Sequence, residues 1–447
     1  MKILFVVIDT LRADHLSAYG YARPTSPNLD ALARNGILFE NFFAGNIPTQ
    51  PAFTSIYTSQ LGITHGVVQH GSPDSQLSDE TPVLPAILRA KGYTTAAVDN
   101  LYNHKPWFAR GYDFYINPHT SQLITADEVN AKAIPWIQEH AAEDFFLFVH
   151  YWDPHTPYLP PEAYRNVYYK GDKNNPANRS MEPVKRQLVY PFFKKWHYDR
   201  LEPFTDIEYL VAQYDAEITY VDNEVGKLLD ALADAGIADD TVVIVTSDHG
   251  ENMTEHELYF DHAGLYEANI RVPLIIKIPG DPSRGKRIAA MAQHIDLAPT
   301  VLELAGVQRP QSMEGQSLVP LIAGREEDGH DAIYAAECTW QAKWAIRTSE
   351  WKLIKTVDPG LYGAEETELY NLSADPGEER NVFAKQSQIA DALELRLMRW
   401  IWEQLGSRPD PVRAFASRGF PPKHWVARAL QDMNVTWDEW VEKQKYI

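Results

Sequence analysis

The stretch Thr241-Val-Val-Ile-Val-Thr-Ser-Asp248-His249-Gly250-Glu251 decides the fold. It opens on a run of β-branched residues, which predicts a strand buried on both faces of a parallel sheet. The strand ends abruptly at Ser-Asp-His-Gly. Because ligands gather beyond the carboxyl ends of strands in open α/β sheets, Asp248 and His249 are candidate metal ligands or catalytic groups. On this stretch alone, a loop that only caps the next segment remains an alternative.

A second strand end carries another carboxylate. Residues 3–8 are fully apolar, which predicts a central strand that ends at Asp9. Asp9 and Asp248 lie far apart in the sequence, but parallel strands would bring them to the same edge of one sheet. Further strands are expected at residues 37–43 and 93–98, and a helix at residues 83–92.

Composition narrows the class of protein. The 447 residues suffice for two or three units, or for one large α/β domain with an appendage. The formal net charge of −20 argues against a nucleic-acid partner and against an anionic membrane surface. An anionic substrate would therefore need a local cation, such as a bound metal. The single cysteine, Cys338, fits a reducing compartment, and the short apolar start requires no signal peptide, so we expect a cytoplasmic protein.

Thr49 is a further candidate site residue. It lies between Pro48 and Pro51 and opens an apolar helical run. The pattern would place the threonine hydroxyl and the first amide N–H groups at a helix N-terminus, which attracts anions. On local sequence alone, an ordinary N-cap threonine is the simpler interpretation.

A series of motifs follows along the chain. They are Ile8-Asp9-Thr10, Thr49-x-Pro51 through His65-Gly66, Asp153-Pro154-His155, Ser247-Asp248-His249-Gly250, Arg271-Val272-Pro273, His294-Ile295-Asp296 and Glu368-Leu369-Tyr370. Taken in this order, the motifs resemble the sulfatase family of the alkaline phosphatase superfamily. The resemblance extends over roughly residues 2–385 and implies a mainly parallel sheet sandwiched by helices at residues 1–320, with a smaller α+β unit, built on an antiparallel sheet, at 321–405.

The chain departs from the family pattern where sulfate is handled. Typical members carry a cysteine or serine, oxidised to formylglycine, at the position of Thr49, and an arginine at the position of Phe53. Threonine is not a substrate for that oxidation. A family lysine is replaced by His262, and no lysine stands within residues 98–103, where the family's Gly-Lys-Trp-His element should fall. Threonine nucleophiles are instead typical of the phosphate-handling branches of the superfamily.

The resemblance implies that Asp9, Thr49, Asp248 and His249 bind one divalent cation. Oxygen ligands with a single histidine tolerate Mn²⁺, Ca²⁺, Mg²⁺ or Zn²⁺. Such a cation lowers the pKa of the threonine hydroxyl and offsets charge on phosphoryl oxygens. We therefore expect Thr49 to attack phosphorus and to form a phosphothreonine that water hydrolyses.

Two histidines are the other catalytic candidates. By the resemblance, His155 contacts the substrate anion or protonates the leaving oxygen, unless it is a structural loop histidine. His262 would hydrogen-bond a nonbridging oxygen or act as a general acid, because histidine titrates near neutrality. A second metal site built from Asp261, His262 and His155 stays open. Asp153 would orient His155 or bind that second metal.

Two irregular parts complete the chain. Residues 159–204 are rich in Pro, Tyr, Lys and Trp without a clear period, which predicts an excursion over the mouth of the active site. A long helix is expected from residue 205. The tail at residues 406–447 carries three tryptophans and no family motif. It is expected to pack against the body or against another subunit, as in a homo-oligomer.

The sequence thus predicts a soluble metal-dependent hydrolase of phosphate esters, phosphodiesters or phosphonate esters. Its substrate would be a small anionic ester, with no nucleic-acid or membrane partner. A sulfate-ester hydrolase acting through unmodified Thr49 and a phosphoryl transferase are alternatives. A binding protein without activity is least favoured, because Asp9, Asp248 and His249 are retained beside a competent hydroxyl.

Overall fold

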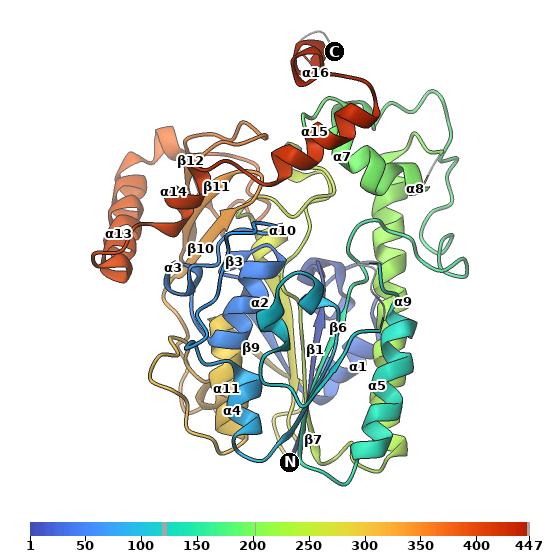
Figure 1. Ribbon diagram of the computed structural model, residues 1–447, viewed down its shortest axis with the longest axis vertical. Helices are drawn as coiled ribbons and strands as arrows, with labels where there is room; N and C mark the ends of the chain where they lie inside the picture. Colours follow the sequence, from blue (N-terminus) through green and yellow to red (C-terminus); the bar gives the residue numbers. More distant parts are fainter. Residues whose placement is uncertain (119–122, 202, 445–447) are drawn as a thin grey trace.

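The computed structural model describes residues 1–118, 123–201 and 203–444. Its main sheet has eight strands in the order β5-β4-β6-β1-β7-β8-β2-β9 (Figure 1). Neighbouring strands are parallel except at β8, which is antiparallel to β7 and β2. The predicted mainly parallel sheet is confirmed. Its strands are β1 Lys2–Ile8, β2 Ile37–Phe43, β4 Thr94–Val98, β5 Phe114–Ile116, β6 Phe145–Tyr151, β7 Thr241–Thr246, β8 Arg271–Lys277 and β9 Lys286–Gln293.

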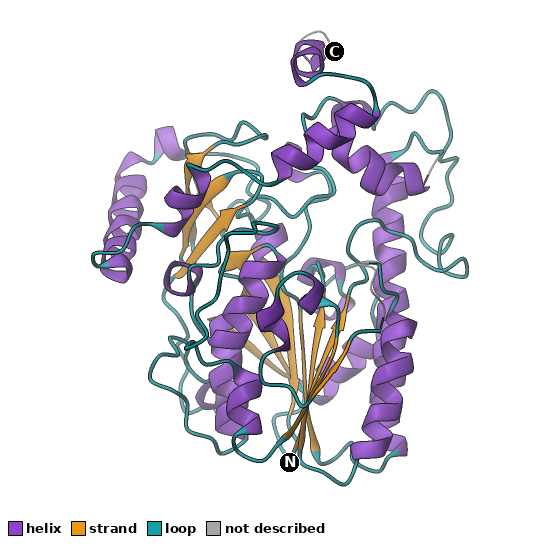
Figure 2. Cartoon of the chain, in the orientation of Figure 1, coloured by secondary structure: helices purple, strands orange, loops and turns teal. Residues whose placement is uncertain are grey.

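Helices cover both faces of this sheet (Figure 2). Alternate residues of β1 divide between the two cores, as the pleat of a strand requires. Ile3, Phe5 and Val7 pack with α2, α4 and α11, whereas Leu4, Val6 and Ile8 pack with α1, α5 and α9. These helices are α1 Pro27–Asn35, α2 Thr49–Thr58, α4 Leu84–Arg89, α5 Ala126–His140, α9 Ile207–Asp234 and α11 Leu297–Leu304.

The helix expected at residues 83–92 is shorter than predicted, because it ends at Arg89 with Ala90 as its C-cap, and the chain turns at Gly92, whose φ is +92°. The remaining helices are mostly short. They are α3 Gly62–His65, α6 Glu182–Lys185, α7 Tyr190–Phe193, α8 Asp199–Leu201, α10 Glu267–Ile270, α12 Val319–Ile322, α13 Ser387–Leu405, α14 Pro411–Ala416, α15 Pro422–Asp432 and α16 Trp437–Gln444.

A second sheet of five strands has the order β13-β12-β11-β10-β3. Its last four strands in sequence are antiparallel, as predicted, and are β10 Ile333–Cys338, β11 Ala342–Arg347, β12 Trp351–Asp358 and β13 Thr367–Asn371. The fifth strand corrects the expectation of a purely carboxyl-terminal sheet. It is β3, Asn46–Ile47, which pairs parallel with β10 and leads directly into Thr49.

Buried ion pairs join the two sheets. Lys352 on β12 is fully buried and places its Nζ 2.8 Å from Glu267 Oε1 and 2.7 Å from Glu378 Oε1. Glu267 begins α10, next to strand β8 of the main sheet. Because β3 and these ion pairs tie the parts together, the division of the chain near residue 320 remains a prediction.

The tail packs on the body rather than extending from it. In Figure 1, α15 lies beside α7 of the irregular segment at residues 159–204, which we call the covering segment. Trp440 on α16 donates its Nε1–H to the carbonyl oxygen of Leu188, at 3.1 Å, and stacks near Tyr190. The last three residues of the tail lie outside the described residues. No described helix is both long enough and apolar enough to cross a membrane.

Candidate functional site

Two neighbouring strand ends bring Asp9 and Asp248 together. Strands β1 and β7 are parallel, with Val7 opposite Thr246, so the two carboxylates emerge from the same edge of the sheet. His249 follows directly, and its Nε2 lies 3.3 Å from Asp248 Oδ2 and 4.0 Å from Asp9 Oδ1. All three side chains are fully buried. The structure therefore assembles three of the four predicted metal ligands.

The donor set of this cluster suits a divalent cation. Ligand atoms of Asp9, Asp248 and His249 all lie within 4.8 Å of one another. Asp9 Oδ1 and Asp248 Oδ2 are buried and have no hydrogen-bond partner among the described residues. Burial raises the pKa of both carboxyl groups well above their usual range, and a neighbouring carboxylate raises it further, Glu251 for Asp9 and Asp9 for Asp248. A bound cation would satisfy these oxygens and oppose that rise in pKa.

Thr49 reaches the same cluster from another element. It is the first residue of α2, is 1% exposed, and places Oγ1 3.3 Å from His249 Nε2. The imidazole is oriented from its other side, because His249 Nδ1 lies 2.9 Å from the carbonyl oxygen of Gly250, which can only accept. All four residues predicted to bind the cation thus meet at one place.

Phe53 lies one turn farther along α2 and is fully buried. Its ring packs edge-on against His150, with centroids 4.9 Å apart. His150 in turn places Nε2 3.2 Å from Asp9 Oδ2. Phe53, which stands where the family carries arginine, therefore supports the His150 imidazole beside Asp9 by apolar packing. His150 was missed in the sequence because it stands inside the apolar strand β6.

His155 approaches the cluster from the loop after β6. Its Nδ1–H donates to the carbonyl oxygen of Thr156 at 2.7 Å, and its ring lies 5.3 Å from that of His262. Burial lowers the pKa of His155 well below its ordinary value. The neutral ring therefore keeps Nε2 as an acceptor.

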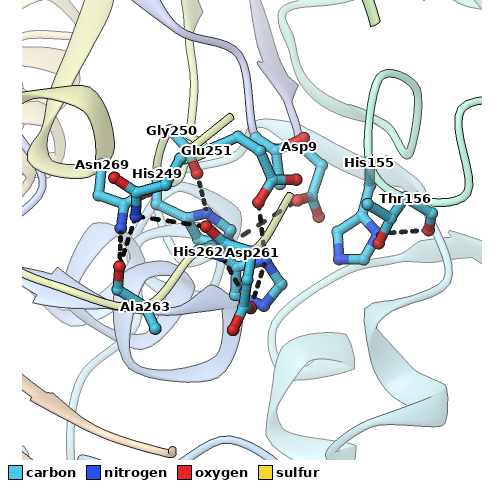
Figure 3. Close-up of polar contacts among 12 residues, drawn as sticks. Asp9, His155, Thr156, His249, Gly250, Glu251, Asp261, His262, Ala263 and Asn269 are labelled. Carbon is cyan, nitrogen blue, oxygen red and sulfur yellow. Dashed lines mark hydrogen bonds and ion pairs between the residues drawn. The ribbon is translucent and has the colours of Figure 1, made fainter. Parts of the chain in front are cut away.

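His262 is surrounded by carboxylates. Its ring lies 4.7 Å from the ring of His249, and its Nδ1 is 3.6 Å from Glu251 Oε1 and 3.9 Å from Asp261 Oδ1. Burial alone would lower the pKa of His262, but the carboxylates raise it to about 9. An imidazolium is therefore available beside the cluster at neutral pH. Figure 3 shows Asp9, His249 and His262 gathered together, with His155 on a separate segment to their right.

Glu251 was not singled out from the sequence. It is fully buried, accepts a hydrogen bond from the Tyr158 hydroxyl at 3.1 Å, and faces His262 through its other oxygen. Its position two residues after His249 was the available signal. The sequence predicts only Asp248 and His249 from this stretch as site residues, although Glu251 is the carboxylate that faces the His262 ring.

The proposed second metal site is not supported. Across the described parts of the chain, only Asp9, Asp248 and His249 form a group with ligand atoms within 4.8 Å of one another. Asp261 instead accepts from the backbone N–H of His262, at 2.8 Å, and from the Tyr362 hydroxyl.

The roles suggested for Asp153 were also wrong. Asp153 Oδ2 accepts from the backbone N–H of Ala126, at 2.8 Å, at the N-terminus of α5. It therefore caps a helix, because the unpaired amides of a helix N-terminus attract a carboxylate.

A pocket of about 320 Å³ adjoins His155 and His262. The covering segment lines part of it with Phe192, Phe193 and Trp196, and its place over the mouth of the active site stays a prediction. Lys194 and Lys195 do not line it, since they pair with Asp199 and Asp432.

Two further histidines, His70 and His104, line the same pocket and were not predicted. His104 directly follows the stretch searched for the family's Gly-Lys-Trp-His element. The next residue, Lys105, donates its Nζ to the carbonyl oxygens of Ser72 (2.6 Å) and Ser75 (3.0 Å). That lysine therefore does not take the place of the missing family lysine in the pocket.

Known proteins share this sequence pattern and this fold. The model of the family described as Sulfatase matches residues 2–307. The model described as N-sulphoglucosamine sulphohydrolase, C-terminal, matches residues 254–403. N-acetylglucosamine-6-O-sulfatase of Bacteroides thetaiotaomicron is 24% identical to this chain, over 88% of this chain and 84% of that protein.

Two further relatives carry names from phosphorus chemistry or from the wider superfamily. Multifunctional alkaline phosphatase superfamily protein PehA of Trinickia caryophylli is 26% identical, over 74% of this chain and 79% of its own length. The crystal structure of the phosphonate monoester hydrolase of Agrobacterium radiobacter superposes with a TM-score of 0.74 at 23% identity, covering 90% of this chain and 96% of that one. Together with the match over residues 2–307, the site and the fold show that this chain belongs to the sulfatase family of the alkaline phosphatase superfamily and is a hydrolase of ester bonds.

Proposed function

We propose that this hydrolase acts on phosphorus esters, namely phosphate monoesters, phosphodiesters or phosphonate esters, with Thr49 as its nucleophile. One observation carries the proposal. The Thr49 hydroxyl lies 3.3 Å from His249 Nε2, beside the unpaired oxygens of Asp9 and Asp248. The names of PehA and of the phosphonate monoester hydrolase support the same chemistry.

Asp9, Thr49, Asp248 and His249 would hold the divalent cation. When bound, it supplies positive charge that lowers the pKa of the hydroxyl and offsets charge on the nonbridging oxygens. Phe53 contributes no charge, and the described residues lining the adjoining pocket include no lysine or arginine. The anionic part of the ester would therefore be held at the cluster and by the imidazolium of His262.

The reaction proceeds in two displacements. Thr49 Oγ1, having lost its proton to solvent, bonds to phosphorus as the bond from phosphorus to the leaving oxygen breaks. His262 donates a proton to that oxygen, and a phosphothreonine remains. Water then attacks phosphorus from the side opposite Oγ1 and gives a proton to neutral His262. Oγ1 leaves and regains a proton from solvent, which restores the starting state.

Sulfate-ester hydrolysis without formylglycine is a second candidate. It is favoured by the relatives that are named as sulfatases, including the N-acetylglucosamine-6-O-sulfatase. The cluster offers less to such an ester, because a sulfate ester carries less charge to neutralise than a phosphate monoester.

The deciding experiment compares hydrolysis of matched nitrophenyl phosphate, phosphodiester, phosphonate and sulfate esters by the metal-loaded enzyme. A phosphorus ester should react fastest, and Thr49→Ala should lower its turnover by about a thousand-fold or more. Thr58→Ala is the matched control, because the Thr58 hydroxyl on the same helix donates to the carbonyl oxygen of Thr54 at 2.7 Å, away from the cluster.

Full turnover by Thr49→Ala would overturn the threonine mechanism. A preference for the sulfate ester that still depends on Thr49 would favour the second candidate. His262 would then be the first residue to test as a replacement for the missing sulfate-binding side chains.

A further inference from the structure

The pocket beside the cluster is built mainly from aromatic rings. It shares His155 and His262 with the proposed reaction and extends away from Asp9, Thr49, Asp248 and His249, which do not line it. This is the direction in which a leaving group would point if His155 or His262 faces the leaving oxygen. The lining residues are His70, His104, Trp152, His155, Thr156, Phe192, Phe193, Trp196, Asp261, His262, Thr339, Trp340 and Trp425.

Apart from His262, which belongs to the proposed reaction, the pocket has no free charged side chain to offer a leaving group. The described residues that line it include no lysine or arginine, so a second anionic group on the substrate would lack a partner. Asp261 is its one carboxylate, and that group already accepts from the His262 backbone N–H and from the Tyr362 hydroxyl. Burial lowers the pKa of His70 and His104, so both rings are neutral at ordinary pH. Among the described lining residues other than His262, a charged leaving group therefore finds no free ion-pair partner.

The two hydroxyls that line the pocket already have partners, and the unpaired ring nitrogens of His70, His104 and Trp152 are themselves buried. Thr156 Oγ1 accepts from Trp196 Nε1 at 3.3 Å, and Thr339 Oγ1 lies 3.5 Å from the backbone nitrogen of His70. A sugar would need several polar partners in place of the water it loses, because an unpaired buried hydroxyl is costly. A carbohydrate leaving group is therefore a poor match as well.

Two groups of aromatic rings line the pocket, and we call them the first and the second wall. In the first wall, the ring of Trp152 lies 4.2 Å from the His155 ring and nearly parallel to that of His104. In the second wall, Phe192, Trp340 and Trp425 pack on one another, with centroids between 5.5 and 5.9 Å apart. Flat apolar groups gain from burial between such faces and from offset or edge-on ring contacts.

The second wall depends on parts of the chain outside the main sheet. Phe192 belongs to the covering segment, and Trp425 belongs to α15 of the tail. Trp425 is held closely, because a Cβ at Gly71 would come within 2.7 Å of its Cζ2. Val426 and Leu430, on the same helix, are buried in the core. The wall is thus a fixed part of the fold.

We propose that this pocket binds the leaving group of the ester, and that it selects an uncharged, flat, apolar group such as an aromatic ring. Trp425 and Phe192 are its specificity-determining residues. The inference rests on the proposed function, since it identifies the class of ester that the Thr49 site would cleave. The size of the pocket, about 320 Å³, suits a group of one or two rings.

The test measures kcat/KM of the metal-loaded enzyme on the phenyl and methyl esters of one phosphonate. Trp425→Ala should lower kcat/KM for the phenyl ester roughly 10-fold or more, mainly through KM, and should cause a much smaller loss for the methyl ester. Trp425→Phe, which keeps a ring, should recover much of the loss. Trp402→Ala is the control, because Trp402 is 71% exposed on α13 and does not line the pocket.

A binding measurement keeps the test independent of turnover. Phenol should bind wild type and Thr49→Ala alike, and more weakly to Trp425→Ala and to Phe192→Ala, while choline, glycerol and glycerol phosphate should bind less well than phenol. Equal losses for the phenyl and methyl esters, or a preference for choline, glycerol or glycerol phosphate, would overturn the proposal. If Thr49→Ala keeps full turnover while phenol still binds, only the proposed function fails.

Discussion

Thr49 and Asp248 have different parts in the proposed reaction, so their alanine variants should fail differently. Asp248→Ala should lose both the metal and turnover, because it removes a buried carboxylate of the cluster. Thr49→Ala should keep most of the metal, since Asp9, Asp248 and His249 remain, and should lose turnover. Metal content after gel filtration and turnover on the preferred ester measure both effects. Asp240→Ala, exposed before β7, is the control; metal retained by Asp248→Ala would contradict the assignment.

A buried histidine gives a second prediction at the residue scale. His197 is fully buried among Tyr158, Tyr198 and Phe260, and neither ring nitrogen has a hydrogen-bond partner among the described residues. Burial lowers its pKa to about 3. The folded protein therefore keeps this ring neutral, whereas the unfolded chain binds a proton below about pH 6.5.

Protonation of His197 in the unfolded chain alone should lower the free energy of unfolding in acid. As the pH falls from about 6.5 towards 3, the loss should reach up to about 1.4 kcal/mol per pH unit. His197→Phe should remove this loss and raise the melting temperature more at about pH 5 than at about pH 7.5. Thermal unfolding at the two pH values is the measurement. An equal change at both would show that packing, and not protonation, decides the effect.

At the scale of elements, α9 supplies the cap of α1. Asp222 on α9 accepts from the backbone N–H groups of Asn28 (3.0 Å) and Leu29 (2.8 Å), while Ser26, the N-cap residue of α1, makes no capping bond. Asp222→Ala should cost about 1–3 kcal/mol of stability, because one buried and one half-buried backbone amide lose their acceptor. Thermal unfolding checks this, with Asp230→Ala on the exposed face of α9 as the control. Equal melting temperatures would show that water or a neighbour replaces the cap.

The elements that the sequence could predict are those with a long, regular pattern. Asp9 and Asp248 could be placed at strand ends because each follows an apolar run, β1 or β7, that is succeeded by a turn. Such strand ends can be recognised from the hydrophobic pattern alone. The reversed direction of β8 was not predictable, since a buried antiparallel strand has the same apolar composition as a parallel one. β3 is only two residues long and carries no periodicity.

Site residues with no local signal were missed for a related reason. His150 lies within an apolar strand, and the sequence around Glu251 is typical of a turn. Trp425 reaches the pocket only because the tail folds back on the body, a contact that no local pattern encodes. Asp153 could be located at a strand end, but its direction depends on where α5 begins.

At the scale of the whole molecule, the main sheet and α2 supply the reacting groups, while the covering segment, the turn at Trp340 and the tail supply the pocket walls. The molecule carries a net charge of −20. An anionic ester would therefore approach against the overall field, and local positive charge at the cluster must hold it. Because different parts of the chain build the cluster and the pocket, we predict that a variant can lose the pocket and still keep the cluster.

Removing residues 422–447 is the sharpest such separation. It deletes α15 and α16, and with them Trp425, but keeps α14 and the buried Phe420 under the second sheet. The truncated protein should keep its metal content, because Asp9, Thr49, Asp248 and His249 lie elsewhere. It should lose affinity for phenol and melt at a lower temperature, because Val426, Leu430 and Trp440 are buried against the body. Circular dichroism confirms folding, and metal content and phenol binding are the measurements. Loss of metal together with phenol affinity in a folded truncation would mean that the tail supports the cluster itself, whereas unchanged phenol binding would mean that α15 forms no part of the pocket.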